Sequence, residues 1–299
     1  MIRLGIDIGG TKIRLGLYDG ETLAAAEKLY VKDITDLCGD IRASVDALCA
    51  AAGVSRGDIV SCGVGVPGTV SEDGRTLLKA PNLALLTPDT ADRLEKALGV
   101  PVRLVQDSRA AAWGEYTLGA GRGAKTLICF TLGTGIGTGI VLDGRIVNGA
   151  LGGAGELGHI CVEENGRPCG CGKRGCLEKY AAGIGLGMTA GELFGGAAEA
   201  EILFARAEAG NTDAQAALDR AVTLLGRAVV SAVNLLSPDV VLFSGGLSAR
   251  KTAYLDPLIA YIAAHCYSSD GRLPKLGAAA LGEDAPLAGA AMIGVNSER

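Results

Sequence analysis

Apolar and polar positions along the chain follow two spacings, one typical of strands and one typical of helices. The opening segment MIRLGIDIGG has the pattern of a strand, and further apolar strands are expected at IVSCGVGVPG, VRLVQD and DVVLFSGG. Helical spacing of apolar residues runs from Ile34 to Cys49, with Thr35 as the candidate N-cap. Further helices are expected near Thr90–Leu98 and from about Asn211 to Leu236, the latter ended by Pro238. Strands that alternate with helices in this way predict an α/β fold.

A short segment near the start of the chain recurs in its middle. Asp7–Gly20, DIGGTKIRLGLYDG, aligns without a gap to Thr131–Gly144, TLGTGIGTGIVLDG, at a constant offset of 124 residues (131 − 7). Each copy has an apolar strand, a glycine/threonine turn, a second apolar strand and an Asp-Gly turn. A match of this length also arises by chance, but each copy opens about half of the chain. We therefore expect two α/β domains of similar plan, residues 1–115 and 116–284, facing each other across a cleft suited to a ligand.

Three glycine-rich loops, DIGGTK, TLGTGIGTG and FSGGLS, follow apolar strands. Glycine lets backbone N–H groups approach an anion, and threonine hydroxyls and the ammonium of Lys12 add donors. The loops match neither the Walker pattern nor the dinucleotide fingerprint, because GxxxxGK[ST] is absent and the first turn leads into a strand. One such loop is equally well explained as a tight hairpin turn, but three, with Asp7 beside the first to hold Mg²⁺ through water, favour a nucleotide phosphate site. The candidate nucleotide-binding residues are Asp7, Gly9, Gly10, Thr11, Lys12, Gly133, Thr134, Gly135, Gly245 and Gly246.

The segment PCGCGKRGCLE contains Cys169, Cys171 and Cys176, and His159 lies ten residues before the first of them. One imidazole and three thiolates complete a tetrahedral Cys₃His set, and a set with no open position predicts a structural Zn²⁺. A C-x-C redox pair and free thiols are the alternatives. Cys161 is left out of the set because its apolar neighbours suggest a strand.

A catalytic carboxylate is expected at a strand end, and Asp107 in VRLVQDSRAAAWGE follows an apolar strand. Two roles fit this position equally well: a base that accepts the proton of an attacking hydroxyl, or the N-cap of the next helix. Asn82 in APNL can donate and accept hydrogen bonds to a hydroxyl, or can form a Pro-Asn turn. The backbone of Gly68, in GVPG, would approach the substrate.

Composition narrows the cellular setting. The net charge of −5, with no basic block, argues against nucleic acid as a partner. No signal peptide pattern is present, and no stretch approaches the roughly 20 apolar residues of a membrane span, so no membrane partner is expected. Nine cysteines in 299 residues are too sparse for a secreted disulfide scaffold, so we expect a cytoplasmic protein with reduced thiols. Four of these cysteines are expected to be small core residues: Cys38, Cys49, Cys62 and Cys129.

The motifs DIGGTK, LGTGIGTG, GELGH and CGCGKRGCLE, in that order, resemble the ROK family of sugar kinases and repressors. The resemblance extends over essentially the whole chain. It implies the actin-like (hexokinase, ribonuclease-H-like) α/β fold with two domains and a cleft, and ATP as the phosphoryl donor. It also implies a C-terminal helix, about residues 285–299, that packs on the first domain, and a homodimer or homotetramer.

The same resemblance implies roles for individual residues. It assigns zinc to the four Cys₃His positions and the role of catalytic base to Asp107. With zinc on one nitrogen of His159, the other nitrogen can hydrogen-bond a sugar hydroxyl, so the metal would orient a substrate-binding residue. Gly245 and Gly246 would lie against the adenosine. The expected sugar contacts are Gly68, Asn82, Gln106, Glu156, His159 and Glu178.

The sequence departs from the family pattern beside the catalytic position. Where the family has Asn-Asp-Ala-Asn, this chain has Gln106-Asp107-Ser108-Arg109, so Arg109 places a charge where an amide is usual. This departure, with NLALLTP further upstream, resembles allose kinases. We therefore expect ATP-dependent phosphorylation of a free hexose at its 6-hydroxyl, with glucose and allose as first candidates. The alternatives are an N-acetylmannosamine or fructose kinase and a non-catalytic sugar sensor, whereas a repressor is not expected because only six residues precede Asp7.

Overall fold

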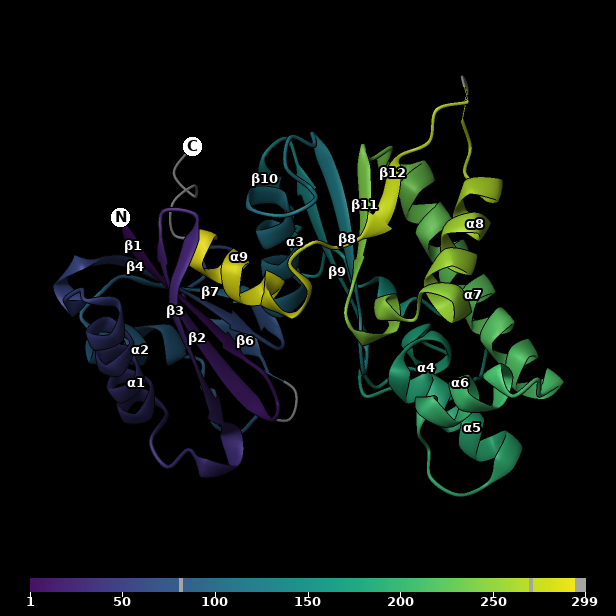
Figure 1. Cartoon of the computed structure of the whole chain (residues 1–299), viewed down its shortest axis with the longest axis horizontal. Helices are drawn as coiled ribbons and strands as arrows, with labels where there is room; N and C mark the ends of the chain where they lie inside the picture. Colours follow the sequence, from purple (N-terminus) through teal and green to yellow (C-terminus); the bar gives the residue numbers. More distant parts are fainter. Residues whose placement is uncertain (81–82, 269–270, 294–299) are drawn as a thin grey trace. The chain divides into compact units, whose positions relative to one another are not determined.

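The structure, a computed structural model, describes residues 1–80, 83–268 and 271–293 of the chain. Its contacts group the chain into two compact units, and Figure 1 colours the chain along its sequence. The first unit is assembled from three separate segments, and the second from two. The first unit comprises Met1–Gly123, Arg145–Ala154 and Glu283–Arg299, and the second comprises Ala124–Gly144 and Gly155–Gly282.

The first unit is built on a five-stranded sheet in the order β3-β2-β1-β4-β7. β1, β2 and β3 are antiparallel neighbours, whereas β4 and β7 run parallel to β1. Its strands are β1 (Ile2–Ile8), β2 (Lys12–Asp19), β3 (Thr22–Tyr30), β4 (Ile59–Val66) and β7 (Val102–Gln106), with a separate hairpin of β5 (Thr69–Val70) and β6 (Leu77–Lys79). Its helices are α1 (Leu37–Ala52), α2 (Thr90–Leu98), α3 (Asp107–Thr117) and α9 (Ala285–Ile293), with short helical turns η1 (Val31–Asp33), η2 (Arg56–Asp58) and η6 (Gly282–Asp284) beside them.

The cap of α1 corrects one expectation. Helix α2 has the expected bounds, but α1 begins at Leu37, because the Asp36 side chain accepts hydrogen bonds from the N–H groups of Cys38 and Gly39. The N-cap is therefore Asp36, and the prediction of Thr35 is wrong. A carboxylate one residue before the first turn satisfies two of the helix's unpaired N–H donors, which Thr35, one residue further away, does not.

Helix α9, yellow in Figure 1, packs against β1, β4 and α3. Glycines make room for it. A Cβ on Gly5 or Gly63 would overlap backbone carbonyls of α9, and Gly114 of α3 lies against Gly289 of α9. The chain thus returns from its far end to complete the core of the first unit.

The second unit contains a sheet in the order β10-β9-β8-β11-β12. β8 and β9 are antiparallel, while β11 runs parallel to β8 and β12 parallel to β11. The strands are β8 (Thr126–Leu132), β9 (Ile136–Leu142), β10 (Arg145–Ile146), β11 (Val240–Ser244) and β12 (Lys275–Ala278). The helices are α4 (Glu178–Ala181), α5 (Gly183–Phe194), α6 (Ala200–Glu208), α7 (Thr212–Leu236) and α8 (Asp256–His265), with the turns η3 (Leu157–His159), η4 (Gly246–Ala249) and η5 (Lys251–Leu255).

The two sheets repeat one topology, which confirms the predicted plan of two similar α/β parts. In each, a hairpin leads and two parallel strands follow. The repeat differs by one residue at the hairpin loop. In the first hairpin, residues 9–12 separate the last paired residues, Ile8 and Ile13, whereas in the second hairpin only residues 133–135 do so.

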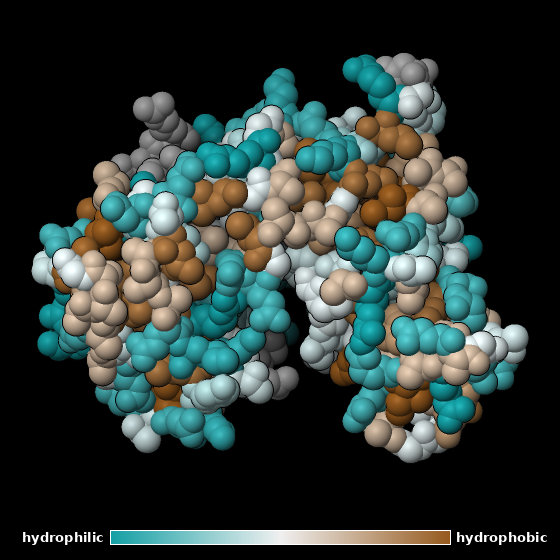
Figure 2. Space-filling view, in the orientation of Figure 1, coloured by the Kyte–Doolittle hydropathy of each residue, from teal (hydrophilic) through white to brown (hydrophobic). Residues whose placement is uncertain are grey.

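The interior and the surface both agree with a globular α/β chain. Cys49, Cys62 and Cys129 are buried, as predicted, and Cys38 is half-buried. On the face drawn in Figure 2, hydrophobic residues are interspersed with hydrophilic ones. Among the described residues, no helix combines the length and the apolar character that a membrane crossing requires.

Candidate functional site

The predicted catalytic and metal-binding carboxylates lie at one edge of the first sheet. β1, β4 and β7 are parallel, so their carboxyl ends meet at the same edge. Asp7 lies near the end of β1, Gly68 shortly follows β4, and Asp107 directly follows β7. The strand order therefore gathers three predicted site residues from distant parts of the sequence.

Asp7 is a half-buried carboxyl beside a second one. Burial, and then the nearby Asp107 carboxylate, raise the pKa of Asp7 to about 6, against the opposing effect of the Arg14 and Lys12 charges. Two carboxylates that repel each other in this way provide the oxygen ligands that Mg²⁺ prefers, and a cation beside them relieves the repulsion. The donors at this edge of the sheet therefore fit Mg²⁺.

Asp107 is the first residue of α3, and the N-cap position belongs to Gln106, which is half-buried at the end of β7. Oδ1 of Asp107 accepts a hydrogen bond of 2.6 Å from the Ser108 N–H. Asp107 thus lies inside the first turn, so the N-cap role that the sequence left open does not apply. The helix N-terminus favours an ionised carboxylate, which is the form that a general base requires.

Arg14 is a residue of this edge that the sequence analysis missed. Arg14 and Lys12 are two apart on β2 and so point to the same face of the strand. Lys12 forms an ion pair of 3.2 Å with Glu283, and Arg14 pairs with Asp284. The signal was available in the alternation of KIRLG, which places both cations on the face that adjoins Asp7.

Arg109 lies in the first turn of α3, and only 2% of its surface is exposed. Its Nη2 donates to the carbonyl oxygens of Gly152 at 2.7 Å and Ala154 at 2.9 Å. Its Nη1 donates to Asn148 Oδ1 at 3.3 Å. The charge expected at this position is therefore directed at the loop of residues 148–154.

Two predicted sugar contacts have different outcomes in the structure. Gly68 has a φ of +123°, and a Cβ there would overlap the carbonyl oxygen of Lys79. The close approach of β6 therefore requires glycine at this position by itself, independently of any substrate. Asn82 lies outside the described residues.

The first glycine loop is exposed at Gly10 and Thr11. A Cβ on Gly10 would meet no atom within 4 Å, so the backbone there is open to a ligand. Gly9 donates its N–H to the carbonyl of Lys12 at 2.9 Å, and neither glycine has a positive φ. Gly10 therefore leaves space beside the backbone rather than permits a left-handed turn, whereas a Cβ on Gly9 would lie 3.2 Å from the carbonyl oxygen of Lys12.

The second loop is held by hydrogen bonds from α5, and the third loop contains a left-handed glycine. The N–H groups of Gly183 and Ile184, in the first turn of α5, donate to the carbonyls of Gly133 and Thr134 at 2.9 and 3.1 Å. In the third loop, Gly245 has a φ of +88°, which an L side chain rarely adopts. The space beside the other glycines of these loops differs. A Cβ on Gly246 would meet no atom within 4 Å, whereas a Cβ on Gly135 would lie 3.0 Å from Glu178 Oε2.

His159, Cys169, Cys171 and Cys176 form a cluster, here called the Cys₃His cluster, whose ligand atoms all lie within 4.8 Å of one another. Cys171 Sγ is 3.6 Å from Cys176 Sγ, and His159 Nδ1 is 3.6 Å from Cys169 Sγ. Tetrahedral zinc with bonds of about 2.0–2.3 Å separates its ligand atoms by about 3.5–3.8 Å, whereas disulfide sulfurs lie about 2.05 Å apart. Both printed separations therefore suit a tetrahedral metal site and neither is a disulfide, so the four predicted ligands form a candidate metal site.

Cys161 was predicted to lie on a strand outside this set. The structure gives it a single β-bridge to Cys176 rather than a strand, and it is not part of the cluster. The extended segment at Cys161 is thus shorter than expected, and a ligand set without Cys161 stays a prediction.

Two predicted sugar-binding side chains of the second unit, Glu156 and Glu178, lie beside His159 of the cluster. His159 Nδ1 faces Cys169, while its Nε2 lies 3.8 Å from Glu156 Oε2. Glu178 Oε1 lies 3.9 Å from His159 Nδ1 and 3.2 Å from Cys169 Sγ. A metal bound through Nδ1 would leave Nε2 to donate or accept a hydrogen bond elsewhere.

Arg167, just before the cluster, is a second residue that the sequence analysis did not single out. Its Nη1 donates to the carbonyls of Lys179 at 2.7 Å and Gly185 at 2.9 Å. Its Nε donates to Glu192 Oε1 at 3.1 Å. Arg167 therefore connects the segment that carries the three cysteines to α4 and α5. No local pattern in the sequence predicts contacts of this kind.

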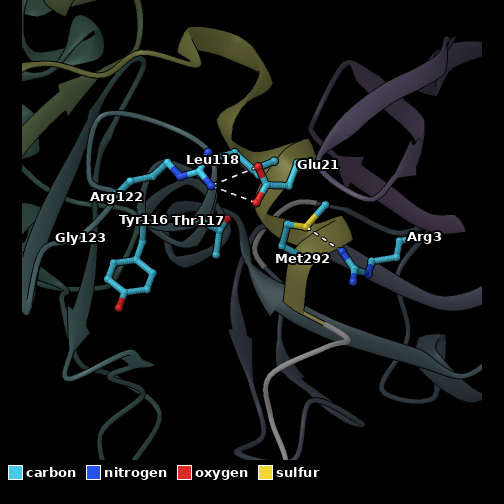
Figure 3. Close-up of a pocket in the computed structure, with 8 residues that line it drawn as sticks. All are labelled: Arg3, Glu21, Tyr116, Thr117, Leu118, Arg122, Gly123 and Met292. Atoms are coloured by element: carbon cyan, nitrogen blue, oxygen red, sulfur yellow. Dashed lines mark hydrogen bonds and ion pairs between the residues drawn. The ribbon is translucent and has the colours of Figure 1, made fainter. Parts of the chain in front are cut away.

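A cavity of about 340 Å³ in the first unit shares no residue with the predicted site (Figure 3). Arg122 pairs with Glu21 across it at 2.9 Å, and Arg3 donates to Met292 Sδ at 3.3 Å. Since Met292 belongs to α9 and Arg3 to β1, these contacts join elements of the first unit.

Comparison with known proteins gives consistent matches over nearly the whole chain. The sequence profile of the ROK family matches residues 3–296. A glucokinase from Streptomyces coelicolor is 33% identical over 277 residues, which cover 86% of each chain. An N-acetylmannosamine kinase from Vibrio vulnificus is 31% identical, covering 92% of this chain and 96% of that protein. A ROK family glucokinase from Streptomyces griseus, solved in complex with glucose and AMPPNP, has 32% identity and a TM-score of 0.78, covering 97% of this chain and 98% of its own.

These matches confirm the actin-like α/β fold in two parts that the motifs implied. The two relatives compared by sequence are sugar kinases, which supports a sugar kinase activity for this chain.

Proposed function

We propose that this chain, which belongs to the ROK family, transfers the γ-phosphoryl group of ATP to the 6-hydroxyl of a free hexose, with glucose and allose as first candidates. The observation that carries the proposal is the pair of carboxylates at the edge of the first sheet, close enough for Asp107 to raise the pKa of Asp7. Phosphoryl transfer to a hydroxyl needs a base for the hydroxyl proton and a group that holds a metal ion.

Asp107 accepts the proton of the 6-hydroxyl as that oxygen attacks the γ-phosphorus. Asp7 would hold Mg²⁺ through water, and the ion, when bound, neutralises charge on the phosphate oxygens. Lys12 and the open backbone at Gly10 bind phosphate, and Gly245 with its neighbour lies against the adenosine.

The sugar hydroxyls are bound by Glu156, Glu178 and the Nε2 of His159. The spacing of the Cys₃His cluster supports a structural Zn²⁺, and the ion would fix the ring orientation of His159 because Nδ1 faces Cys169. The family further supports a cytoplasmic homodimer or homotetramer.

An N-acetylmannosamine kinase is the second candidate, because a relative with that activity is 31% identical over 92% of this chain. A non-catalytic sensor is less well supported, since Asp107 and all three glycine loops are present.

The test is ADP release with Mg-ATP and a panel of glucose, allose, mannose, fructose, N-acetylmannosamine and N-acetylglucosamine. Turnover of one unsubstituted hexose well above the others supports the proposal. Preference for N-acetylmannosamine selects the second candidate. Binding of a sugar without any ADP release would overturn both and indicate a sensor.

A further inference from the structure

The loop of residues 148–154 is an irregular segment that Arg109 holds in place. Within the loop, the Gly152 N–H donates to the carbonyl of Gly149, and the Ala154 N–H donates to the carbonyl of Asn148. These local bonds shape two turns but do not join the loop to the rest of the unit. The guanidinium of Arg109 does so, through side-chain and carbonyl oxygens at both ends of the loop.

The chemistry of this contact differs from what an amide would provide. Arginine offers five N–H donors in a rigid fork at the end of a long side chain, whereas asparagine offers two donors on a short one. Arg109 lies two residues after Asp107 and is almost fully buried, so its bonds to the loop are shielded from water. The residue that departs from the family pattern is thus the residue that anchors the loop.

The anchored loop leads directly to a predicted sugar contact. Ala154 accepts a bond from Arg109, and Glu156 is two residues further on. Two residues of extended chain span at most about 7 Å, so the backbone of Glu156 lies within that distance of Ala154. At the other end, Arg109 is fixed by α3, whose first residue is Asp107.

We propose that Arg109 is a positioning residue that sets sugar affinity and sugar preference by holding loop 148–154 at the start of the segment that carries Glu156. The proposal rests on the hexose kinase activity proposed above. Arg109 does not touch the sugar itself. Its effect reaches the sugar through the loop and leaves the nucleotide site unaltered.

The experiment measures KM for the preferred hexose and for Mg-ATP in the wild type, Arg109→Asn and Arg109→Lys. We expect the hexose KM to rise about 10- to 100-fold in Arg109→Asn, because misplacement of a binding group by about 1 Å has effects of that size. The Mg-ATP KM should stay within about twofold. Arg109→Lys keeps the charge without the fork and should give a smaller rise. Hydrogen exchange at residues 148–155 should be faster in both variants.

Two further variants guard against a simple folding defect. Asn148→Ala removes one acceptor and leaves Arg109 intact, so it should raise the hexose KM by a smaller factor. Arg122→Gln, at an exposed arginine of the same unit, should leave both KM values unchanged. Equal rises in the two KM values, or faster exchange in the loop with an unchanged hexose KM, would overturn the proposal.

Failure of the kinase activity itself can be told apart from failure of this inference. If the wild type releases no ADP with any sugar, calorimetric sugar affinity replaces KM in the same set of variants. Weaker sugar binding in Arg109→Asn with unchanged binding of Mg-ATP would then support the anchor, and unchanged sugar binding would refute it.

Discussion

The hairpins β1–β2 and β8–β9 repeat each other in sequence and in strand order, yet their loops differ. The first loop is one residue wider, is exposed at its tip, and has Asp7 and Lys12 at its base. The second loop has only uncharged residues, and the first turn of α5 holds its carbonyls. The shared backbone therefore fixes where a loop lies, and the side chains around it decide whether the loop carries charge.

The difference extends to the surroundings of each loop. The first unit presents two half-buried carboxylates and two cations, whereas the second presents a cluster of candidate metal ligands. We therefore expect chemistry to depend on the first unit, and sugar binding and metal-dependent stability to depend on the second.

The largest expected effect is on turnover. Asp107→Asn removes the base without changing the size of the side chain, so kcat should fall by about 10²- to 10⁴-fold. Calorimetric affinity for the hexose should persist, because the binding groups around the Cys₃His cluster remain. A variant that keeps the wild-type kcat would exclude Asp107 as the base.

Loss of a cluster ligand should act on binding and stability. Purified wild-type protein should contain about one zinc per chain, and Cys171→Ser should lower that content. The sugar affinity should weaken by about 10- to 100-fold, because His159 is no longer oriented. Cys266→Ser, outside the cluster, is the matched control. An unchanged sugar affinity in zinc-free Cys171→Ser would show that the cluster serves stability alone.

The third effect is on the free energy of unfolding: Asp7→Asn should be more stable than the wild type, by an amount that depends on pH. The folded-state pKa of Asp7 is raised from 3.8 to about 6, so the folded state binds this proton more tightly than the unfolded chain does. The stabilisation of the folded state by this proton is complete below about pH 4 and is lost as pH rises through about 6. Asp7→Asn, which stays neutral, should therefore be more stable than the wild type by about 2–3 kcal/mol at pH 8.

Urea unfolding without Mg²⁺ at pH 4.5 and pH 8 measures this difference. The advantage of Asp7→Asn should shrink to about 1 kcal/mol at the lower pH, and phosphoryl transfer should be impaired at both. Equal stability of the two proteins at pH 8 would contradict the raised pKa.

The smallest effect distinguishes an open glycine from a structural one. Gly10→Ala adds a methyl group where no atom lies within 4 Å, so stability should change by less than about 1 kcal/mol. The KM for Mg-ATP should rise several-fold, since the methyl group occupies the space that phosphate would approach. Gly277→Ala in β12, also without close neighbours, should change neither quantity. A Gly10→Ala enzyme with an unaltered KM would remove this loop from the phosphate site.

Features that depend on nearby residues could be predicted from the sequence. Helix α7 was expected from about Asn211. Asn211 is its N-cap, and the side chain accepts a hydrogen bond from the Ala214 N–H in the first turn. The Cys₃His cluster was predicted because its members lie within a short stretch with ligand spacing. The repeated hairpins could be predicted because strand, turn and strand follow one another directly.

Features that depend on distant residues could not be predicted from the sequence. The carbonyls that meet Arg109 are about forty residues away, and nothing in their identity marks them, because every residue has a carbonyl. The raised pKa of Asp7 depends on strand order and burial rather than on its neighbours in sequence. The assignment of catalytic, nucleotide and sugar roles stays a prediction for the experiments above.

Helix α9 has a consequence for the order in which the protein is made. During synthesis β1, β4 and α3 leave the ribosome early. The glycines that contact α9, namely Gly5, Gly63 and Gly114, stay uncovered until α9, which ends at Ile293, has been made. All segments of the second unit precede that helix. The second unit is therefore complete in the nascent chain first, and the first unit, whose strands are translated earliest, cannot complete its core until α9 has been made.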